Sequence, residues 1–304
     1  IVDEYTGRMA EGRKWRDGIH QAIEAKEKVE ITVPTGQAAR ITVQDLFLRY
    51  QHLAGMTGTA RTAAREFRKI YRHRVFQIPT NRPRNRSNLK ARVYATGEQK
   101  LAAITEEVSE LHQQGRPVLI GTRTIDKSQR LSELLTEAGI THVVLNAREI
   151  EHEADIVAAA GQQGKVTVAT NMAGRGTDIK LQEGIAEKGG LHVICTELHE
   201  SARIDRQLIG RCGRQGDPGS YRQFMAVDDE ILQEGFGPER AERLQRQTAD
   251  VGGEIGNFRS ILRRAQRKVE RKHFRDRNVL LHHERERKKL QKELGQDPYL
   301  DTTE

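Results

Sequence analysis

A regular alternation of strand and helix patterns between residues 98 and 227 limits the possible folds more than any other feature. Short apolar runs predict strands at Pro117–Gly121, His142–Leu145, Val166–Thr170, Leu191–Thr196 and Tyr221–Val227. Apolar residues three and four positions apart predict helices at Glu98–Gln114, Ser128–Ala138, Glu149–Ala160 and Ser201–Gly210. Strands that alternate with helices favour a parallel sheet covered on both faces. We therefore predict an α/β fold with a doubly wound parallel sheet.

A glycine-rich loop follows the predicted strand Val166–Thr170. It contains Gly174, Arg175, Gly176 and Asp178. Open α/β sheets bind ligands at the carboxyl ends of their strands, and glycine lets the backbone approach a ligand closely. We expect this loop to contact a ligand. A surface ion pair between Arg175 and Asp178 is the simpler structural alternative.

A second stretch, from Gln207 to Asp217, places Arg211 and Arg214 at the end of a predicted helix. Two guanidinium groups at this spacing suit bidentate contacts with phosphate. The alternative is a pair of surface arginines near the negative end of the helix dipole. The two stretches, in this order, resemble motifs V and VI in the second RecA-like lobe of superfamily 2 ATPase motors.

The positive charge is concentrated near the end of the chain. The 304 residues carry a net charge of +8, whereas residues 263–292 contain 13 Lys and Arg against 4 Asp and Glu. The rest of the chain is therefore close to neutral. A basic segment of this kind can meet nucleic acid, anionic lipid or an acidic partner. We predict a helix over Ile261–Leu294 because apolar residues recur along it between the charges.

The first residues suggest a fragment of a longer protein. The chain begins at Ile1, has no secretory signal and has no apolar run long enough for a transmembrane helix. Asp3 and Glu4 follow an apolar pair, as the acidic residues of a Walker B motif do. We favour a turn instead, because the sequence contains no Gly-x-x-x-x-Gly-Lys-Ser/Thr phosphate-binding loop. Cys195 and Cys212 lack metal-ligand spacing, and no metal site is expected.

Helical patterns also precede the alternating region. They cover Glu11–Glu27, where Trp15 and Ile19 begin an apolar face, and Val43–Leu53. Leu53–Ala60 carries small residues and hydroxyls that suit motif III of helicase-like motors. Its alternative is a plain turn into a helix over Ala63–Tyr71, capped by Thr62.

Several motifs together resemble the bacterial preprotein translocase motor SecA. They are Ile1–Arg8, Gly12–Glu27, Leu53–Ala60, Pro79–Pro83, Asn171–Asp178, His199–Ser201 with Arg203–Asp205, and Gly213–Asp217. Nucleic-acid helicases usually carry other residues in motifs V and VI, so nucleic acid is not the expected partner. The resemblance extends to about Leu281 and implies a divergent SecA-like protein with a shortened C-terminal end.

The resemblance implies four segments. Residues 1–78 would be the C-terminal part of the first nucleotide-binding domain, and 79–83 would be a linker stiffened by two prolines. Residues 84–237 would be the second RecA-like nucleotide-binding domain with motifs IV to VI. Residues 238–304 would be a helical scaffold segment with the basic tail.

The resemblance also implies roles for individual residues. Asp178 would contact the nucleotide ribose and Arg175 would sense the nucleotide state, with Gly174 and Gly176 giving the backbone room. Arg211 and Arg214 would be catalytic, one of them as an arginine finger, and Gln215 would lie beside them. The cofactors would be ATP and Mg²⁺, held mainly by the first lobe. His199, Glu200 and Asp205 would brace the lobe.

As a whole, the resemblance implies an ATP-driven motor for protein export. Its partners would be preproteins, a membrane protein-conducting channel and, through the basic tail, anionic lipid; it could form a homodimer. It would act in the cytoplasm at the inner face of the plasma membrane. Without a phosphate-binding loop, the isolated chain is expected to be inactive. A helicase second lobe and a non-catalytic regulatory lobe are the alternatives.

Overall fold

A seven-stranded sheet, formed by strands between residues 86 and 226, organises the chain. The computed structural model describes residues 1, 12–15, 18–32, 41–145, 153–170 and 177–299. The strands are β1 (Arg86–Asn88), β2 (Arg92–Tyr94), β3 (Val118–Thr122), β4 (His142–Leu145), β5 (Val166–Thr170), β6 (Leu191–Cys195) and β7 (Gly219–Ala226). They are ordered β1-β7-β6-β3-β5-β4, with β2 also on β7, and each strand pairing is parallel. The predicted α/β fold with a parallel sheet is confirmed.

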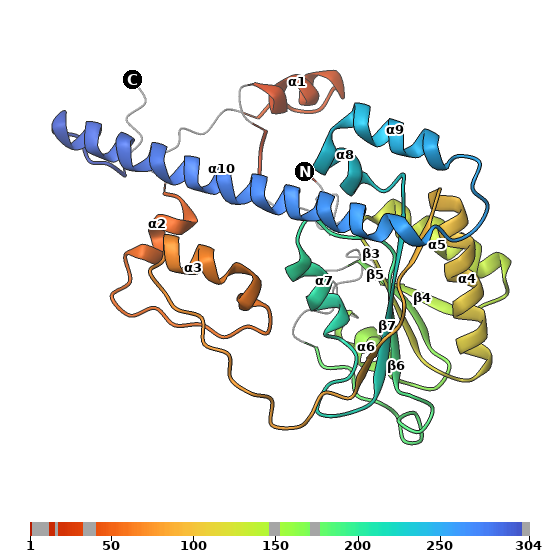
Figure 1. The fold of residues 1–304 in the computed structure, drawn as a ribbon. Helices are drawn as coiled ribbons and strands as arrows, with labels where there is room; N and C mark the ends of the chain where they lie inside the picture. Colours follow the sequence, from red (N-terminus) through yellow and green to blue (C-terminus); the bar gives the residue numbers. More distant parts are fainter. Residues whose placement is uncertain (2–11, 16–17, 33–40, 146–152, 171–176, 300–304) are drawn as a thin grey trace.

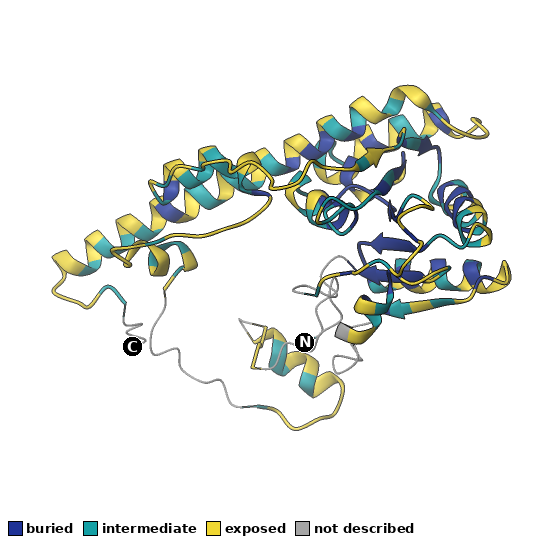
Figure 2. Ribbon diagram, turned by 90° about the horizontal axis from the view of Figure 1, so that it is seen from below, coloured by how far each residue is buried: buried dark blue, intermediate teal, exposed yellow. Residues whose placement is uncertain are grey.

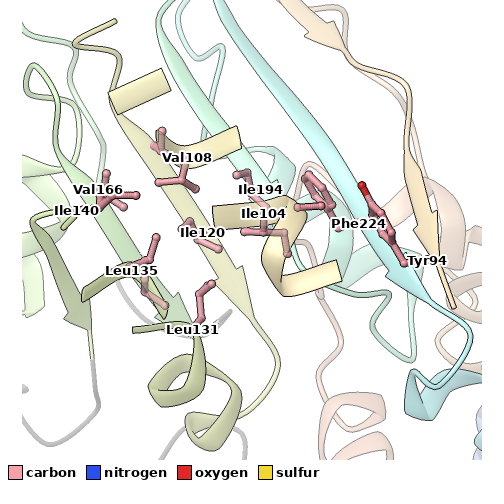
Figure 3. Close-up of a cluster of buried hydrophobic side chains, with 13 residues drawn as sticks. Tyr94, Ile104, Val108, Ile120, Leu131, Leu135, Ile140, Val166, Ile194 and Phe224 are labelled. Atoms are coloured by element: carbon pink, nitrogen blue, oxygen red, sulfur yellow. The ribbon is translucent and has the colours of Figure 1, made fainter. Parts of the chain in front are cut away.

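The central strands contribute to two separate cores, because successive side chains of a strand point to opposite faces of the sheet. In β3, Val118 and Ile120 join one buried cluster, whereas Leu119 joins the other. The first cluster lies under α4 (Gly97–Gln113) and α5 (Ile125–Glu137), as Figure 3 shows. The second lies under α6 (Glu153–Ala159) and α7 (Ala202–Ile209). Helices therefore cover both faces, which is the doubly wound arrangement.

A third cluster joins the sheet to the C-terminal helices. These are α8 (Glu230–Phe236), α9 (Pro238–Thr248), the short η2 (Gly256–Phe258) and α10 (Arg259–Glu293). Leu262, Ala265 and Val269 recur on one face of α10 and pack in this cluster with residues of β7 and α8. The 35-residue helix crosses the molecule and extends far beyond the sheet (Figure 1). The predicted long C-terminal helix is confirmed.

The N-terminal elements lie outside the sheet. They are α1 (Ile19–Lys26), α2 (Val43–Leu48), η1 (Ala60–Ala63) and α3 (Ala64–Ile70). α2 and α3 lie along the far half of α10, where Arg277 forms a double contact with Glu66 and Lys288 pairs with Asp45. Most residues of this region are exposed or half-buried (Figure 2).

Two local predictions in this region were wrong in detail. The helix expected over 11–27 begins only at Ile19, because Gly18 before it has a φ of +77°, outside the helical range. Thr62 does not cap the next helix: its hydroxyl donates to the Thr59 carbonyl at 3.0 Å, and a 3₁₀ turn comes first. Among residues 41–85 the structure has no strand before the turn at Leu53–Ala60.

Across the described part of the chain, none of the helices is long and apolar enough to cross a bilayer.

Candidate nucleotide-facing site

The two stretches singled out in the sequence meet on one surface. Thr177 and Asp178 come soon after the carboxyl end of β5, and Arg211 and Arg214 follow the end of α7. Gly174, Arg175 and Gly176 lie outside the described residues, so the structure gives no geometry for them. The site is therefore built from Asp178 and from the loop 210–218 that connects α7 to β7.

An ion pair joins these stretches. The Arg214 Nη1 atom lies 2.6 Å from Asp178 Oδ1, while Arg214 Nε donates to the Gly210 carbonyl at 3.0 Å. Arg211 Nη1 donates to the Thr177 carbonyl at 3.1 Å. Both arginines thus reach the segment after β5, across 34 and 36 positions of sequence. Gln215 follows Arg214 in the same loop.

The pair is accessible to solvent. The side chains of Arg214 and Asp178 are 35% and 45% exposed. Exposed ion pairs contribute only about 0–1 kcal/mol because water screens them, so a ligand can exchange with either partner at small cost. The carboxylate can then accept from hydroxyl groups, and the guanidinium can donate to phosphate oxygens. The arrangement fits a ligand that carries both.

The loop is fastened to the sheet by a residue that the sequence pattern did not reveal. Arg86, in β1, donates from Nη1 to the Ile209 carbonyl at 2.7 Å and to the Cys212 carbonyl at 3.2 Å. It thereby satisfies carbonyls at the end of α7 that lack a helical partner. Gly213 has a φ of +61°, and a Cβ there would lie 2.7 Å from Arg86 Cβ, so the loop packs tightly on this arginine.

At the other end of α7, a buried polar cluster joins the helix to α10. Asp205 is buried, and its Oδ1 accepts from the His199 amide at 3.0 Å and from His199 Nδ1 at 2.8 Å. Its Oδ2 accepts from Gln266 Nε2, on α10, at 2.8 Å. Glu270 of α10 accepts from the Ala202 amide at 2.7 Å. The predicted bracing by His199 and Asp205 is thus seen as direct contacts to the long helix.

Side chains of the protein itself cover the carboxyl ends of two other strands, β3 and β6. Arg123 follows β3, is buried, and pairs with Glu200 at 3.0 Å and Glu234 at 2.7 Å. Lys127 lies 2.9 Å from both Glu197, which follows β6, and Glu230. These pairs join the ends of β3 and β6 to α8. Among the described residues, the surface beside Asp178 and Arg214 is an exposed part of this edge that a ligand can reach. Within the described residues, no group of three or more His, Cys, Asp or Glu could hold a metal ion.

A parallel sheet with helices on both faces, and an arginine loop set against a carboxylate beyond the sheet's carboxyl edge, have the form of a RecA-like lobe. A family model described as "SecA DEAD-like domain" matches residues 3–68, and a second one described as "SecA P-loop domain" matches residues 83–185 and 182–250. The chain belongs to the SecA family, as its motifs suggested.

Curated relatives agree with this placement. The chain is 66% identical over 302 residues to protein translocase subunit SecA 2 of Rhodopirellula baltica, covering 99% of this chain and 46% of the relative. It is 50% identical over 284 residues to protein translocase subunit SecA of Nitratidesulfovibrio vulgaris, covering 92% of this chain and 34% of the relative. The chain therefore spans less than half the length of these two relatives.

Among solved structures, one match is the E. coli DEAD-box protein SrmB bound to regulator of ribonuclease activity A. Its sequence identity to this chain is 20% and its TM-score is 0.38, over 53% of this chain and 87% of that chain.

Proposed function

We propose that this chain supplies the second-lobe wall of an ATP site in a SecA-type protein translocase motor. The observation that carries the proposal is the contact between Asp178 and Arg214, two residues from separate motifs that meet on an exposed surface. Gly174, Arg175, Gly176 and Gln215 belong to the same proposed site on the strength of the family motifs. The relatives' names favour a translocase over the helicase alternative.

The chemistry of the side chains would give the carboxylate and the arginines different roles at the nucleotide. Asp178 would accept hydrogen bonds from the ribose hydroxyls and orient the nucleotide. Arg211 and Arg214 would donate to the phosphates, and one of them would stabilise charge that develops on the γ-phosphate during hydrolysis. Mg²⁺, held mainly by the first lobe, would neutralise phosphate charge when bound.

The segments proposed from the resemblance complete the motor. Residues 1–78 would belong to the first nucleotide-binding domain and 79–83 to the linker between lobes. Residues 84–237 would form the second lobe and 238–304 the scaffold that carries movement outward. We include preproteins, a protein-conducting channel, anionic lipid at the exposed cations of α10, and a second copy of the chain as partners. The place of action would be the cytoplasmic face of the membrane.

The test compares two arginines in the full-length parent protein. Arg214→Ala should lower the kcat of Mg²⁺-dependent ATP hydrolysis about a thousandfold, as loss of an arginine finger does. Arg206→Ala is the matched control, because Arg206 is an exposed arginine on α7 with no side-chain partner among the described residues. Asp178→Ala should mainly raise the KM for ATP, since a ribose contact is made equally in the ground and transition states.

The isolated 304-residue chain should bind nucleotide weakly and not hydrolyse it, because its sequence has no phosphate-binding loop. A Mg²⁺-dependent ATPase activity of this chain that disappears with Arg214→Ala would contradict the division of the site between two lobes. Tight binding to single-stranded nucleic acid with a steep salt dependence would instead favour the helicase alternative.

A further inference from the structure

The loop that carries Arg211 and Arg214 has a second attachment, to the segment that joins the two parts of the chain. Arg82 lies within residues 79–83, which have no regular secondary structure. Its Nη1 donates to the Gln215 carbonyl at 3.2 Å, across 133 positions of sequence. Arg82 therefore contacts the residue next to Arg214.

The local backbone is shaped to receive this side chain. Gln215 has a φ of +53° and Gly216 a φ of +87°, both in the left-handed region. A Cβ on Gly216 would lie 3.1 Å from Arg82 Cδ and 3.2 Å from Arg82 Cβ, so the arginine stem packs directly on the glycine. A non-glycine residue at positive φ is strained, and it persists where neighbours hold it in place. The Arg82 contact is one such neighbour for Gln215.

The two contacts that hold the loop, one from Arg86 and one from Arg82, differ in the movements that they can pass to it. Arg86 belongs to β1, which pairs in parallel with β7, so it holds the loop to the body of the sheet. Arg82 is exposed and belongs to the irregular segment before that strand. A change in the path of this segment moves Arg82 without moving the sheet. Such a change of path would therefore affect the Arg214 end of the loop before the rest of the loop.

We propose that Arg82 is a positioning residue that couples the 79–83 segment to the arginine loop. When the lobes shift, the segment between them changes its path, and the Arg82–Gln215 contact displaces or releases Arg214. This coupling rests on the proposed function of the site, and it assigns to the linker an effect on catalysis beyond its role as a tether.

The chain offers a matched control two residues away. Arg84 is also an exposed arginine, and its side chain makes no hydrogen bond or ion pair with the described residues. Arg82→Met keeps a stem that can pack on Gly216 but removes the donor to Gln215, and Arg84→Met makes the same chemical change without a contact to lose. Arg82→Lys restores a cationic donor of similar reach.

The experiment measures ATP hydrolysis by the full-length parent protein, with Arg214→Ala as reference. Arg82→Met should lower kcat about fivefold, which is about 1 kcal/mol in activation free energy, with the KM for ATP unchanged within about twofold. Arg84→Met should match the parent, and Arg82→Lys should recover at least half of the lost rate. Hydrogen exchange at residues 212–217 should be faster in Arg82→Met and unchanged in Arg84→Met.

The outcomes separate this coupling from the function of the site. If Arg214→Ala abolishes hydrolysis while the kcat of Arg82→Met equals that of Arg84→Met, the coupling is overturned and the site stands. Failure of Arg82→Lys to recover any rate also overturns it, because the hydrogen bond would not be the cause. If Arg214→Ala leaves hydrolysis intact, the proposed function itself is wrong and the coupling falls with it.

Discussion

The buried carboxylate of Asp205 offers the sharpest test of how the lobe is held to its long helix. Asp205→Asn keeps the shape of the side chain but replaces one oxygen by an NH₂ group. Oδ1 accepts two donors from His199, and Oδ2 accepts one from Gln266. Whichever way the asparagine amide is turned, its NH₂ group faces a donor. The substitution therefore leaves a buried donor unsatisfied.

The surroundings do not allow an easy rearrangement. Gln266 is buried, its Nε2 also donates to the His199 carbonyl at 2.8 Å, and its Oε1 accepts from Arg263 at 3.0 Å. Turning the Gln266 amide would place an oxygen against that carbonyl. Hydrogen bonds to charged groups contribute about 1.5–3 kcal/mol, and an unsatisfied buried donor costs about 1–3 kcal/mol. These costs overlap, so we expect Asp205→Asn to lower the free energy of unfolding by about 2–4 kcal/mol.

Urea unfolding, followed by circular dichroism at 222 nm, measures this effect. Tryptophan fluorescence is unsuitable because the single tryptophan, Trp15, lies in the N-terminal region outside the sheet. The midpoint for Asp205→Asn should fall by about 1 M. Asp250→Asn is the control, because Asp250 is exposed and has no partner within the described part of the chain. Equal midpoints for the two variants would refute the inference that Asp205 joins α7 to α10.

Two further predictions concern buried positions. Burial raises the pKa of Asp229 to about 6 from 3.8, although Lys100 beside it lowers the pKa. The stability contributed by the protonated acid is complete below about pH 4 and is lost as pH rises through about 6. Lys100→Met should therefore lower the free energy of unfolding by about 3 kcal/mol at pH 7.5 and by less at pH 5. Equal shifts of the urea midpoint at the two pH values would contradict this. Gly121→Ala should lower the free energy of unfolding by about 1–3 kcal/mol, because its Cβ would lie 2.2 Å from a methyl group of Leu208. Adding Leu208→Val should recover part of this loss in thermal unfolding. If the effects of the two substitutions simply add, the clash is disproved.

The sequence predicted the elements whose formation depends on buried apolar residues. The runs at β3, β4 and β5 were located within about one residue. β3 and β5 are central parallel strands, which are apolar along their length, and the edge strand β4 still carries three apolar residues in a row. β1 was missed because Arg86–Asn88 carries no apolar residue, and it forms a strand only by pairing with β7. α8 was missed because Glu230–Phe236 has seven residues, too few for a periodic pattern.

The site was predicted in part, and the reason lies in the distance along the chain between its residues. Loops at carboxyl ends of strands pointed to Asp178, and the family motifs pointed to Arg214, but neither indicated that the two side chains form an ion pair. Arg82 and Arg86 gave no signal. Their partners are backbone carbonyls more than 120 positions away, and a carbonyl leaves no mark in the sequence. Such contacts become visible only when the loop has its folded shape.

These contacts give α7 a particular place in the lobe. It is only eight residues long, about 12 Å, and it is fastened at both ends. Glu270 and Gln266 of α10 hold its first turn, and Arg86 holds its last carbonyls. The long helix is thus attached to the start of α7 and the linker to the loop after it. If both attachments position the arginines, combining Asp205→Asn with Arg82→Met should affect catalysis more than additively.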